Sequence, residues 1–280
     1  MDLLEDRIAG GSAPGSATFA PTARRRGRQA AHARGAGLSE RAAQYASAAS
    51  EALAETLWPT RCAVCDEPGE VLCESCRQNL PYLDWWRACP RCGAPFGRVQ
   101  CTECNAVMMD RRGRDEPPFA ACASATVFEE PSARIVRTWK DAGERRLGPV
   151  MARIMAQVVP PTWKAEEPVA VPIPASLRAK RRRGFDHGAE LASFVAEELG
   201  LPMAEPLARP WAADQRKLAG EERVANMQGR FRVLPGADPP PVALLVDDVY
   251  TTGSTLFSAS DALLAAGSER VYCLTFTRVW

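Results

Sequence analysis

The 280-residue sequence lacks any apolar run of about 18 residues, the length that a membrane-spanning helix requires. We expect no secretory signal either, because no apolar core follows a basic start in its first residues. The net charge is only +1, so bulk electrostatics do not demand a nucleic-acid or membrane partner, although local charge still matters. We therefore expect a cytoplasmic protein whose thiols stay in a reducing compartment.

Cysteine, by contrast, is abundant: eight of the ten cysteines lie between residues 62 and 104. They form four Cys-x-x-Cys pairs, namely Cys62 with Cys65, Cys73 with Cys76, Cys89 with Cys92 and Cys101 with Cys104. Four thiolates in a tetrahedron make a closed structural zinc site, so eight ligands predict two Zn²⁺ ions. The simplest arrangement is sequential, with the first two pairs on one ion and the last two on the other. An iron–sulfur cluster and a dithiol redox role are the alternatives.

Composition divides the chain into five parts. Residues 1–38 are rich in Gly, Ala, Ser and Arg and predict a disordered tail. An alanine-rich helix is expected at residues 39–58, and Pro59 ends it. The cysteines then define a double zinc ribbon at residues 59–106, followed by a linker at residues 107–118 with charges and two prolines. Residues 119–280 form the main domain.

Apolar runs alternate with amphipathic segments in this main domain. We expect strands at residues 120–128, 169–173, 242–246 and 271–276, and helices at residues 132–140, 147–158, 187–199 and 254–266. Strands that alternate with helices predict an α/β fold, with a mostly parallel sheet covered by helices on both faces.

The strand at residues 242–246 precedes a short polar segment that suits a phosphate. Two acids, Asp247 and Asp248, follow the strand, and a loop and a helix come next. The loop residues are Thr251, Thr252, Gly253, Ser254 and Thr255. They offer hydroxyls and backbone N–H groups at a helix N-terminus, where the helix dipole favours an anion. The alternative is a tight strand-to-helix turn in which the acids only cap local backbone.

The string from Val246 to Thr255 resembles the phosphoribosyl diphosphate (PRPP) signature of type I phosphoribosyltransferases. The complete layout, with a double zinc ribbon before such a domain, resembles the ComF family. Further stretches carry the resemblance: residues 137–143, 171–174, 181–187 and 215–218, with Arg223, Asn226 and Phe231. Two departures concern residues 139–140, where the aromatic residue and the lysine are swapped, and Asp186 with His187, which replace Asn and Gln.

The resemblance implies a role for each group of residues. Asp247 and Asp248 would hold the ribose hydroxyls, and residues 251–255 would hold the 5′-phosphate. Pro174, Ala175 and Ser176 would bind the pyrophosphate, together with Mg²⁺. Lys140 would contribute to the PRPP site, and Arg216 with Lys217 would lie on a mobile loop over it.

Two classes of function follow from these expectations. The first is an enzyme that transfers phosphoribosyl from PRPP to a nitrogenous acceptor. The second is a non-catalytic accessory protein with a vestigial PRPP site, which handles single-stranded DNA or contacts DNA-processing proteins during competence. A PRPP-responsive regulator is a third alternative. The basic run at residues 178–183 suits either a pyrophosphate or a nucleic-acid backbone.

Overall fold

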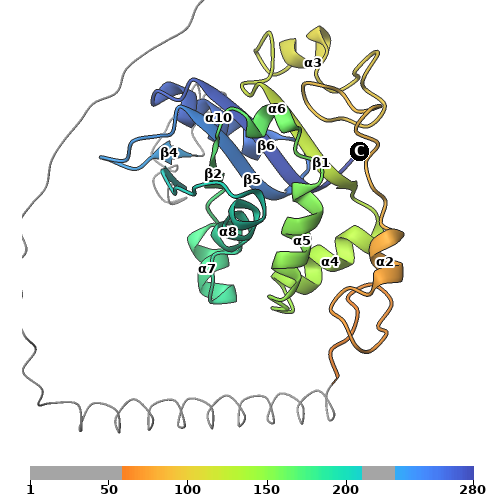
Figure 1. Cartoon of the computed structure of the whole chain (residues 1–280). Helices are drawn as coiled ribbons and strands as arrows, with labels where there is room; N and C mark the ends of the chain where they lie inside the picture. Colours follow the sequence, from red (N-terminus) through yellow and green to blue (C-terminus); the bar gives the residue numbers. More distant parts are fainter. Residues whose placement is uncertain (1–58, 210–230) are drawn as a thin grey trace, which may run out of the picture. The chain divides into compact units, whose positions relative to one another are not determined.

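Four parallel strands form the central sheet of the protein. The computed structural model describes residues 59–209 and 231–280. Across the sheet, the order is β1 (Ala121–Val127), β6 (Arg270–Arg278), β5 (Val242–Tyr250) and β2 (Val169–Pro172) (Figure 1). All three strand pairings are parallel, so the strands end at the same edge of the sheet. The predicted α/β architecture is confirmed.

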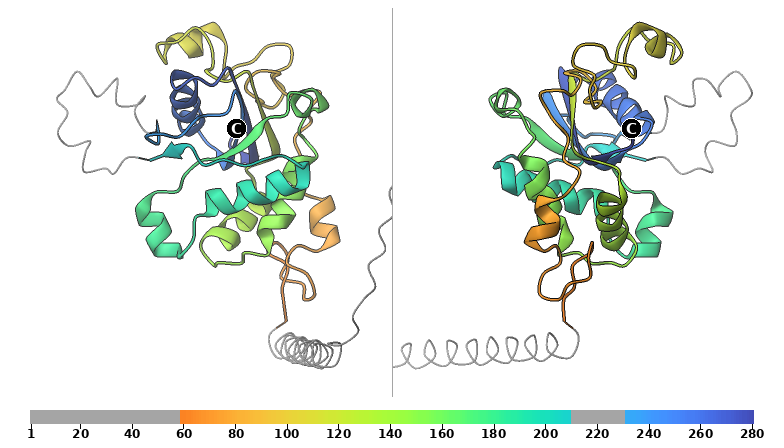
Figure 2. Two further views of the ribbon diagram at one scale, coloured as in Figure 1. Left: turned by 60° about the vertical axis from the view of Figure 1, so that its left-hand side comes forward. Right: turned by 90° about the vertical axis from the view of Figure 1, so that its right-hand side faces the viewer.

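Helices cover both faces of this sheet. Alternate residues of β5 pack against the helices on either face. Leu244 and Val246 point into one core cluster, whereas Ala243 and Leu245 point into the other, as the two-residue period of a strand requires. The first cluster includes residues of α4 (Glu130–Lys140), α5 (Leu147–Ala156) and α8 (His187–Leu199). The second includes residues of α10 (Ser254–Ala265), which lies on the opposite side of the sheet (Figure 2).

The cysteine module lies along β1, the edge strand of the sheet. The backbone N–H of Leu83 donates to the carbonyl of Ala125 at 3.0 Å, and the N–H of Cys122 donates to the carbonyl of Arg91 at 2.8 Å. The module thus supplies hydrogen-bond partners to an edge that would otherwise be open. Its first half packs into the α4 and α5 side through Cys62, whereas its second half packs into the α10 side.

Short elements complete the described part of the chain. They are α2 (Glu74–Gln78), α3 (Ala106–Asp110), α6 (Pro161–Lys164), α7 (Leu177–Arg183) and an antiparallel pair of β3 (Leu207–Ala208) with β4 (Arg232–Val233). Helix α3 occupies the start of the segment that the sequence suggested as a linker. The predicted tail, the helix at residues 39–58, and Arg216 with Lys217 lie outside the described residues. Among the helices described, none combines the length and apolarity needed to cross a membrane.

Strand β5 is longer than the sequence predicted. It was expected to end at Val246, ahead of the two acids, because Asp is depleted in strands. Instead it continues through Asp247 and Asp248 to Tyr250, pairing with β6 along the way. The longer pairing partner and the cation opposite Asp248 outweigh the low strand propensity of Asp. The two carboxyl groups consequently lie within the paired part of the strand, close enough to shift each other's pKa.

Candidate anion-binding site and zinc centres

The acid pair of β5 is closely associated with Lys140. The ammonium of Lys140, the last residue of α4, forms an ion pair with the carboxylate of Asp248. Burial opposes ionisation of Asp248, but this cation lowers its pKa. The pKa of Asp247 is raised well above 3.8 by burial and by the neighbouring Asp248. The Asp247 carboxylate accepts the backbone N–H of Asp248 at 2.9 Å.

The loop after β5 is a tight turn that depends on Gly253. This residue has φ of +77°, and a Cβ atom there would lie 2.4 Å from the hydroxyl of Tyr250. Helix α10 begins at the next residue, Ser254. The hydroxyls of Thr252 and Ser254 lie 2.9 Å apart, and Thr251 and Thr252 are exposed. Backbone N–H groups and hydroxyls at a helix N-terminus can bind a phosphate.

The loop after β2 lies beside this turn, since β2 pairs with β5 in the sheet. The backbone N–H of Ile173 donates to the carbonyl of Val246 at 3.0 Å. Pro174, Ala175 and Ser176 follow, and the Ser176 hydroxyl accepts the N–H of Ala179 at 3.2 Å as the cap of α7. The predicted pyrophosphate loop and the predicted phosphate loop therefore follow adjacent strands, at the same edge of the sheet.

A cavity of about 400 Å³ opens beside Lys140, the ion-pair partner of Asp248. It is lined by Lys140, Asp141, Ala142, Gly143, Arg182, Arg183 and Phe185. Arg182 and Arg183 pair with Asp141 at 3.3 and 3.1 Å, so part of the positive charge of the basic run is neutralised. Three cations nevertheless border the cavity, and a multiply charged anion would complement them. Two stretches of the family resemblance, far apart in the sequence, meet here.

His187 and Asp186, which depart from the family pattern, have structural contacts. The Asp186 carboxylate caps α8 by accepting the N–H of Gly188 at 3.0 Å, and it pairs with Lys180 at 2.5 Å. The His187 ring packs edge-on against Trp139 at 5.7 Å between centroids. Burial lowers the pKa of His187 to about 4, and Lys140 contributes to that shift. The imidazole is therefore neutral at pH 7 and adds no charge to the site.

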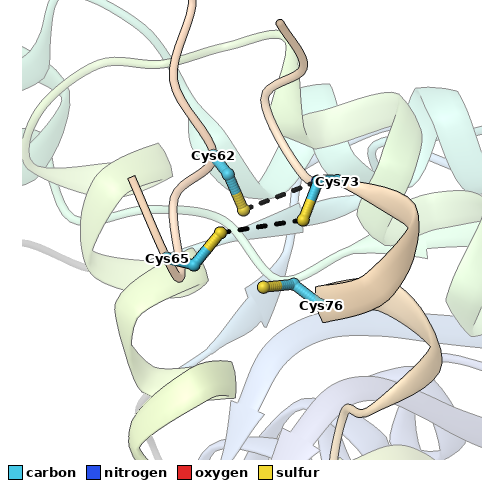
Figure 3. Close-up of side chains that lie close together, drawn as sticks. All are labelled: Cys62, Cys65, Cys73 and Cys76. Carbon is cyan, nitrogen blue, oxygen red and sulfur yellow. Dashed lines mark hydrogen bonds between the residues drawn. The ribbon is translucent and has the colours of Figure 1, made fainter. Parts of the chain in front are cut away.

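The first metal centre unites Cys62, Cys65, Cys73 and Cys76. Their Sγ atoms lie within 4.8 Å of one another and converge on one point (Figure 3). The Cys65 and Cys73 sulfurs are 3.7 Å apart, close to the edge of about 3.8 Å expected for a tetrahedron with Zn–S distances near 2.3 Å. The backbone N–H of Cys73 donates to the Cys62 sulfur at 3.4 Å. The four thiols thus fit a closed Zn²⁺ site.

The second centre unites Cys89, Cys92, Cys101 and Cys104, whose sulfurs also lie within 4.8 Å of one another. Two sulfur–sulfur distances, Cys89 to Cys104 and Cys92 to Cys101, are both 3.5 Å. This site again matches a tetrahedral thiolate cage. The grouping is the sequential one. Cys122 and Cys273 belong to neither group and are buried in the sheet.

Sequence reasoning missed one residue of this region, Arg278. Its side chain is fully buried at the end of β6. It donates to the carbonyl of Cys92 at 2.5 Å, pairs with Glu103, and its guanidinium carbon lies 3.8 Å from the centroid of the Tyr250 ring. Nothing in the local sequence marks this arginine as buried, and only the pairing of β6 with β5 places it here.

The fold and sites define a class of protein: a double zinc ribbon joined to a type I phosphoribosyltransferase-like α/β domain. Residues 53–109 match the double zinc ribbon domain family. The chain is 27% identical over 202 residues to competence protein ComFC of Bacillus subtilis, covering 72% of this chain and 81% of ComFC. It is 28% identical over 233 residues to the DNA utilization protein YhgH of Salmonella typhi, covering 74% and 97% of the two chains.

Competence protein F of Haemophilus influenzae is 23% identical over 208 residues, covering 71% of this chain and 87% of that protein. These relatives match a length that exceeds the zinc ribbon and extends into the α/β domain. Together, these similarities support the assignment of the chain to the ComF family.

Proposed function

We propose that the protein binds PRPP, with Asp247 and Asp248 on the ribose hydroxyls and residues 251–255 on the 5′-phosphate. The observation that carries the proposal is the ion pair of Lys140 with Asp248 at the carboxyl end of β5, directly before the Gly253 turn. Ligands of parallel α/β folds bind at this edge. The cavity bordered by Lys140, Arg182 and Arg183 would take the pyrophosphate.

Transfer of the phosphoribosyl group is the reaction that such a site supports. The bond between ribose C1 and the pyrophosphate oxygen breaks, and the pyrophosphate leaves with the electron pair. A nitrogen of the acceptor then forms the new bond to C1. Mg²⁺ bound with PRPP would neutralise charge on the leaving group. Lys140 and the two arginines would stabilise the same charge in the transition state.

Isothermal titration calorimetry of the full chain with PRPP and Mg²⁺ tests the binding site. The double variant Asp247→Asn, Asp248→Asn should weaken PRPP binding by about 100-fold, since the hydrogen bonds of both acids to the ribose hydroxyls are weakened and the charge of Asp248 is lost. Asp238→Asn, an exposed acid four residues before β5, is the matched control and should bind like the parent. No heat in the parent protein would reject PRPP binding. Pyrophosphate release with a panel of nitrogenous bases then decides whether transfer occurs.

A second candidate function is the handling of single-stranded DNA, and an exposed surface of the zinc ribbon favours it. Trp85 and Trp86 are 70% and 53% exposed, with ring centroids 5.9 Å apart. Phe96 and Trp280 are also exposed and lie 5.4 Å apart, with the Arg87 guanidinium 5.8 Å from the Phe96 ring. Aromatic rings next to an arginine can stack on unpaired bases. Relatives named for competence and DNA utilization agree with this role.

Fluorescence titration with a labelled thymidine oligonucleotide tests this second function. Trp85→Ala with Trp86→Ala should weaken binding by about tenfold or more, because each stacked base contributes about 1–3 kcal/mol. Val107→Ala removes an exposed apolar side chain of α3, directly after this module, and should leave affinity unchanged. Equal loss in both variants, or no binding by the parent at low salt, would contradict a specific stacking surface.

A further inference from the structure

The second zinc centre is joined to the phosphate loop by a continuous set of side-chain contacts. Arg278 is at the centre of this connection, with its side chain 0% exposed. On one side, its guanidinium donates to the carbonyl of Cys92, a zinc ligand, at 2.5 Å. It also pairs with the carboxylate of Glu103. Both partners are parts of the second centre's chain segment: Cys92 is one of its four ligands, and Glu103 stands between the ligands Cys101 and Cys104.

On its other side, Arg278 lies over the ring of Tyr250. The guanidinium carbon is 3.8 Å from the centroid of the Tyr250 ring, within range of a cation–π contact. The Tyr250 hydroxyl is the atom that a Cβ at position 253 would meet at 2.4 Å. The loop therefore closes directly on this ring. A shift of the Tyr250 ring would therefore remove the packing contact that holds the backbone at Gly253.

A second path from the same zinc centre reaches the loop. The chain leaving Cys104 forms α3, and Arg112 follows it. Arg112 donates to the carbonyl of Thr252 at 2.9 Å, and its guanidinium carbon lies 4.7 Å from the centroid of the Phe257 ring. Two arginines thus connect the second zinc centre with the turn before α10. Arg278 does so through the Tyr250 ring, and Arg112 through the carbonyl of Thr252.

The first zinc centre has a different location. It packs against α4 and α5, where Arg134 donates to the carbonyl of Val64 at 2.7 Å. No contact described for residues 59–209 and 231–280 links its ligands to the loop at residues 251–255. The two metal centres are therefore inequivalent with respect to the candidate PRPP site.

We infer that Arg278 and Tyr250 are positioning residues that make the shape of the phosphate loop depend on the second zinc centre. This inference rests on the proposed function in one respect, that PRPP is the ligand of the loop. The coupling between the zinc centre and the loop does not depend on that identity. Zinc held by the second cysteine group fixes the Cys92 carbonyl and the Glu103 carboxylate, and these fix Arg278. Loss of that zinc weakens phosphate binding, whereas loss of the first zinc leaves the loop in place.

A matched pair of glutamates, one in each ribbon, provides the test. Glu103→Gln weakens the contact with Arg278, while all four thiols of the second centre remain. Glu74→Gln is the control, because Glu74 stands between Cys73 and Cys76 and contacts Arg77 and Gln78 of its own helix. Zinc content, hydrogen exchange of the amides at residues 251–255, and the Kd for PRPP with Mg²⁺ are measured on the full chain.

The expected result for Glu103→Gln is a full zinc content, faster exchange at residues 251–255, and a Kd raised by about 5- to 50-fold. Glu74→Gln should match the parent in all three. Arg278→Lys keeps the charge but not the planar stacking on Tyr250, and should show the same faster exchange. Unchanged exchange and Kd in both Glu103→Gln and Arg278→Lys would overturn the inference. If the parent fails to bind PRPP, the proposed function fails, and the exchange data still decide the coupling.

Discussion

Lys140 and Asp248 form an ion pair inside the candidate site, although 108 positions separate them in the sequence. Their side chains are 19% and 5% exposed. Removing two charges from water is costly, and their attraction compensates only while both partners are present. The cation lowers the pKa of Asp248, whereas burial and Asp248 raise the pKa of the adjacent Asp247. Two neighbouring carboxylates are thereby given opposite tendencies to hold a proton.

Lys140→Met should be strongly destabilising, because it leaves Asp248 buried without its cation. We expect a loss of about 3–5 kcal/mol in the free energy of unfolding, measured with urea at pH 7 by tryptophan fluorescence. Arg61→Met removes one partner of the exposed Arg61–Asp66 pair and should cost about 0–1 kcal/mol. Adding Asp248→Leu to Lys140→Met should recover part of the loss. A Lys140→Met cost no larger than that of Arg61→Met would contradict the importance of the pair.

Asp247 should make stability fall as pH rises. Its folded-state pKa is raised well above 3.8, so the folded protein holds this proton more tightly than the unfolded chain. The stabilisation is complete below the unfolded pKa and is lost as pH rises through the folded pKa. Asp247→Asn cannot titrate, so its stability relative to the parent should increase with pH. Unfolding curves at about pH 5.5 and about pH 8.5 measure this difference.

The control for that comparison is Asp238→Asn, an exposed acid whose replacement should change stability equally at both pH values. A stability difference between Asp247→Asn and the parent that stays constant with pH would show that Asp247 is already ionised in the folded protein. The same variant should bind PRPP more weakly than the parent, since an amide replaces a carboxyl group at the ribose hydroxyls.

Much of this architecture was predictable because it depends on local pattern. Apolar runs gave the four strands, and Asp186 with Gly200 marks the two ends of α8, as a capping acid and a left-handed glycine should. The cysteine spacing predicted two zinc sites, since a Cys-x-x-Cys pair already brings two ligands together. It left open which pairs share an ion, and the fold groups them sequentially. Such features can be predicted without knowing which distant segments pack against them.

The remaining features of the site depend on packing between distant segments. The strand at 242–246 was predicted to stop at the acids, because nothing in the sequence says that β6 continues alongside as far as Arg278. The basic run at residues 178–183 suggested uncompensated charge, whereas Asp141 neutralises part of it. Pairing of this kind is decided by side-chain geometry across the fold.

Measurement of the zinc content should separate the eight ligand cysteines from the two that bind no metal. The parent should contain two Zn²⁺ per chain, one for each group of four thiols. Cys89→Ser removes a ligand of the second centre and should leave about one Zn²⁺. Cys122→Ser and Cys273→Ser, which alter buried cysteines outside both groups, should retain both ions. Release with a mercurial reagent and a chromogenic chelator gives the count, and loss of zinc in the Cys122 variant would contradict the assignment.

Gly253→Ala should destroy the phosphate loop for two separable reasons. Its φ of +77° is unfavourable for alanine, and the added Cβ would lie 2.4 Å from the Tyr250 hydroxyl and 2.7 Å from the adjacent ring carbon. Tyr250 is buried and in contact with Arg278, so its ring is not free to move into solvent. The strain in φ alone costs about 1 kcal/mol, and the close contact should add to it.

Gly236→Ala is the matched control, because Gly236 also has φ of +77° but a Cβ there would meet nothing within 4 Å. We expect Gly236→Ala to lower the free energy of unfolding by about 1 kcal/mol and to leave the Kd for PRPP unchanged. Gly253→Ala should lower it further and abolish PRPP binding, because the loop must open to relieve the contact. Equal destabilisation of the two variants would mean that the loop accommodates the methyl group, and that Tyr250 does not define its shape.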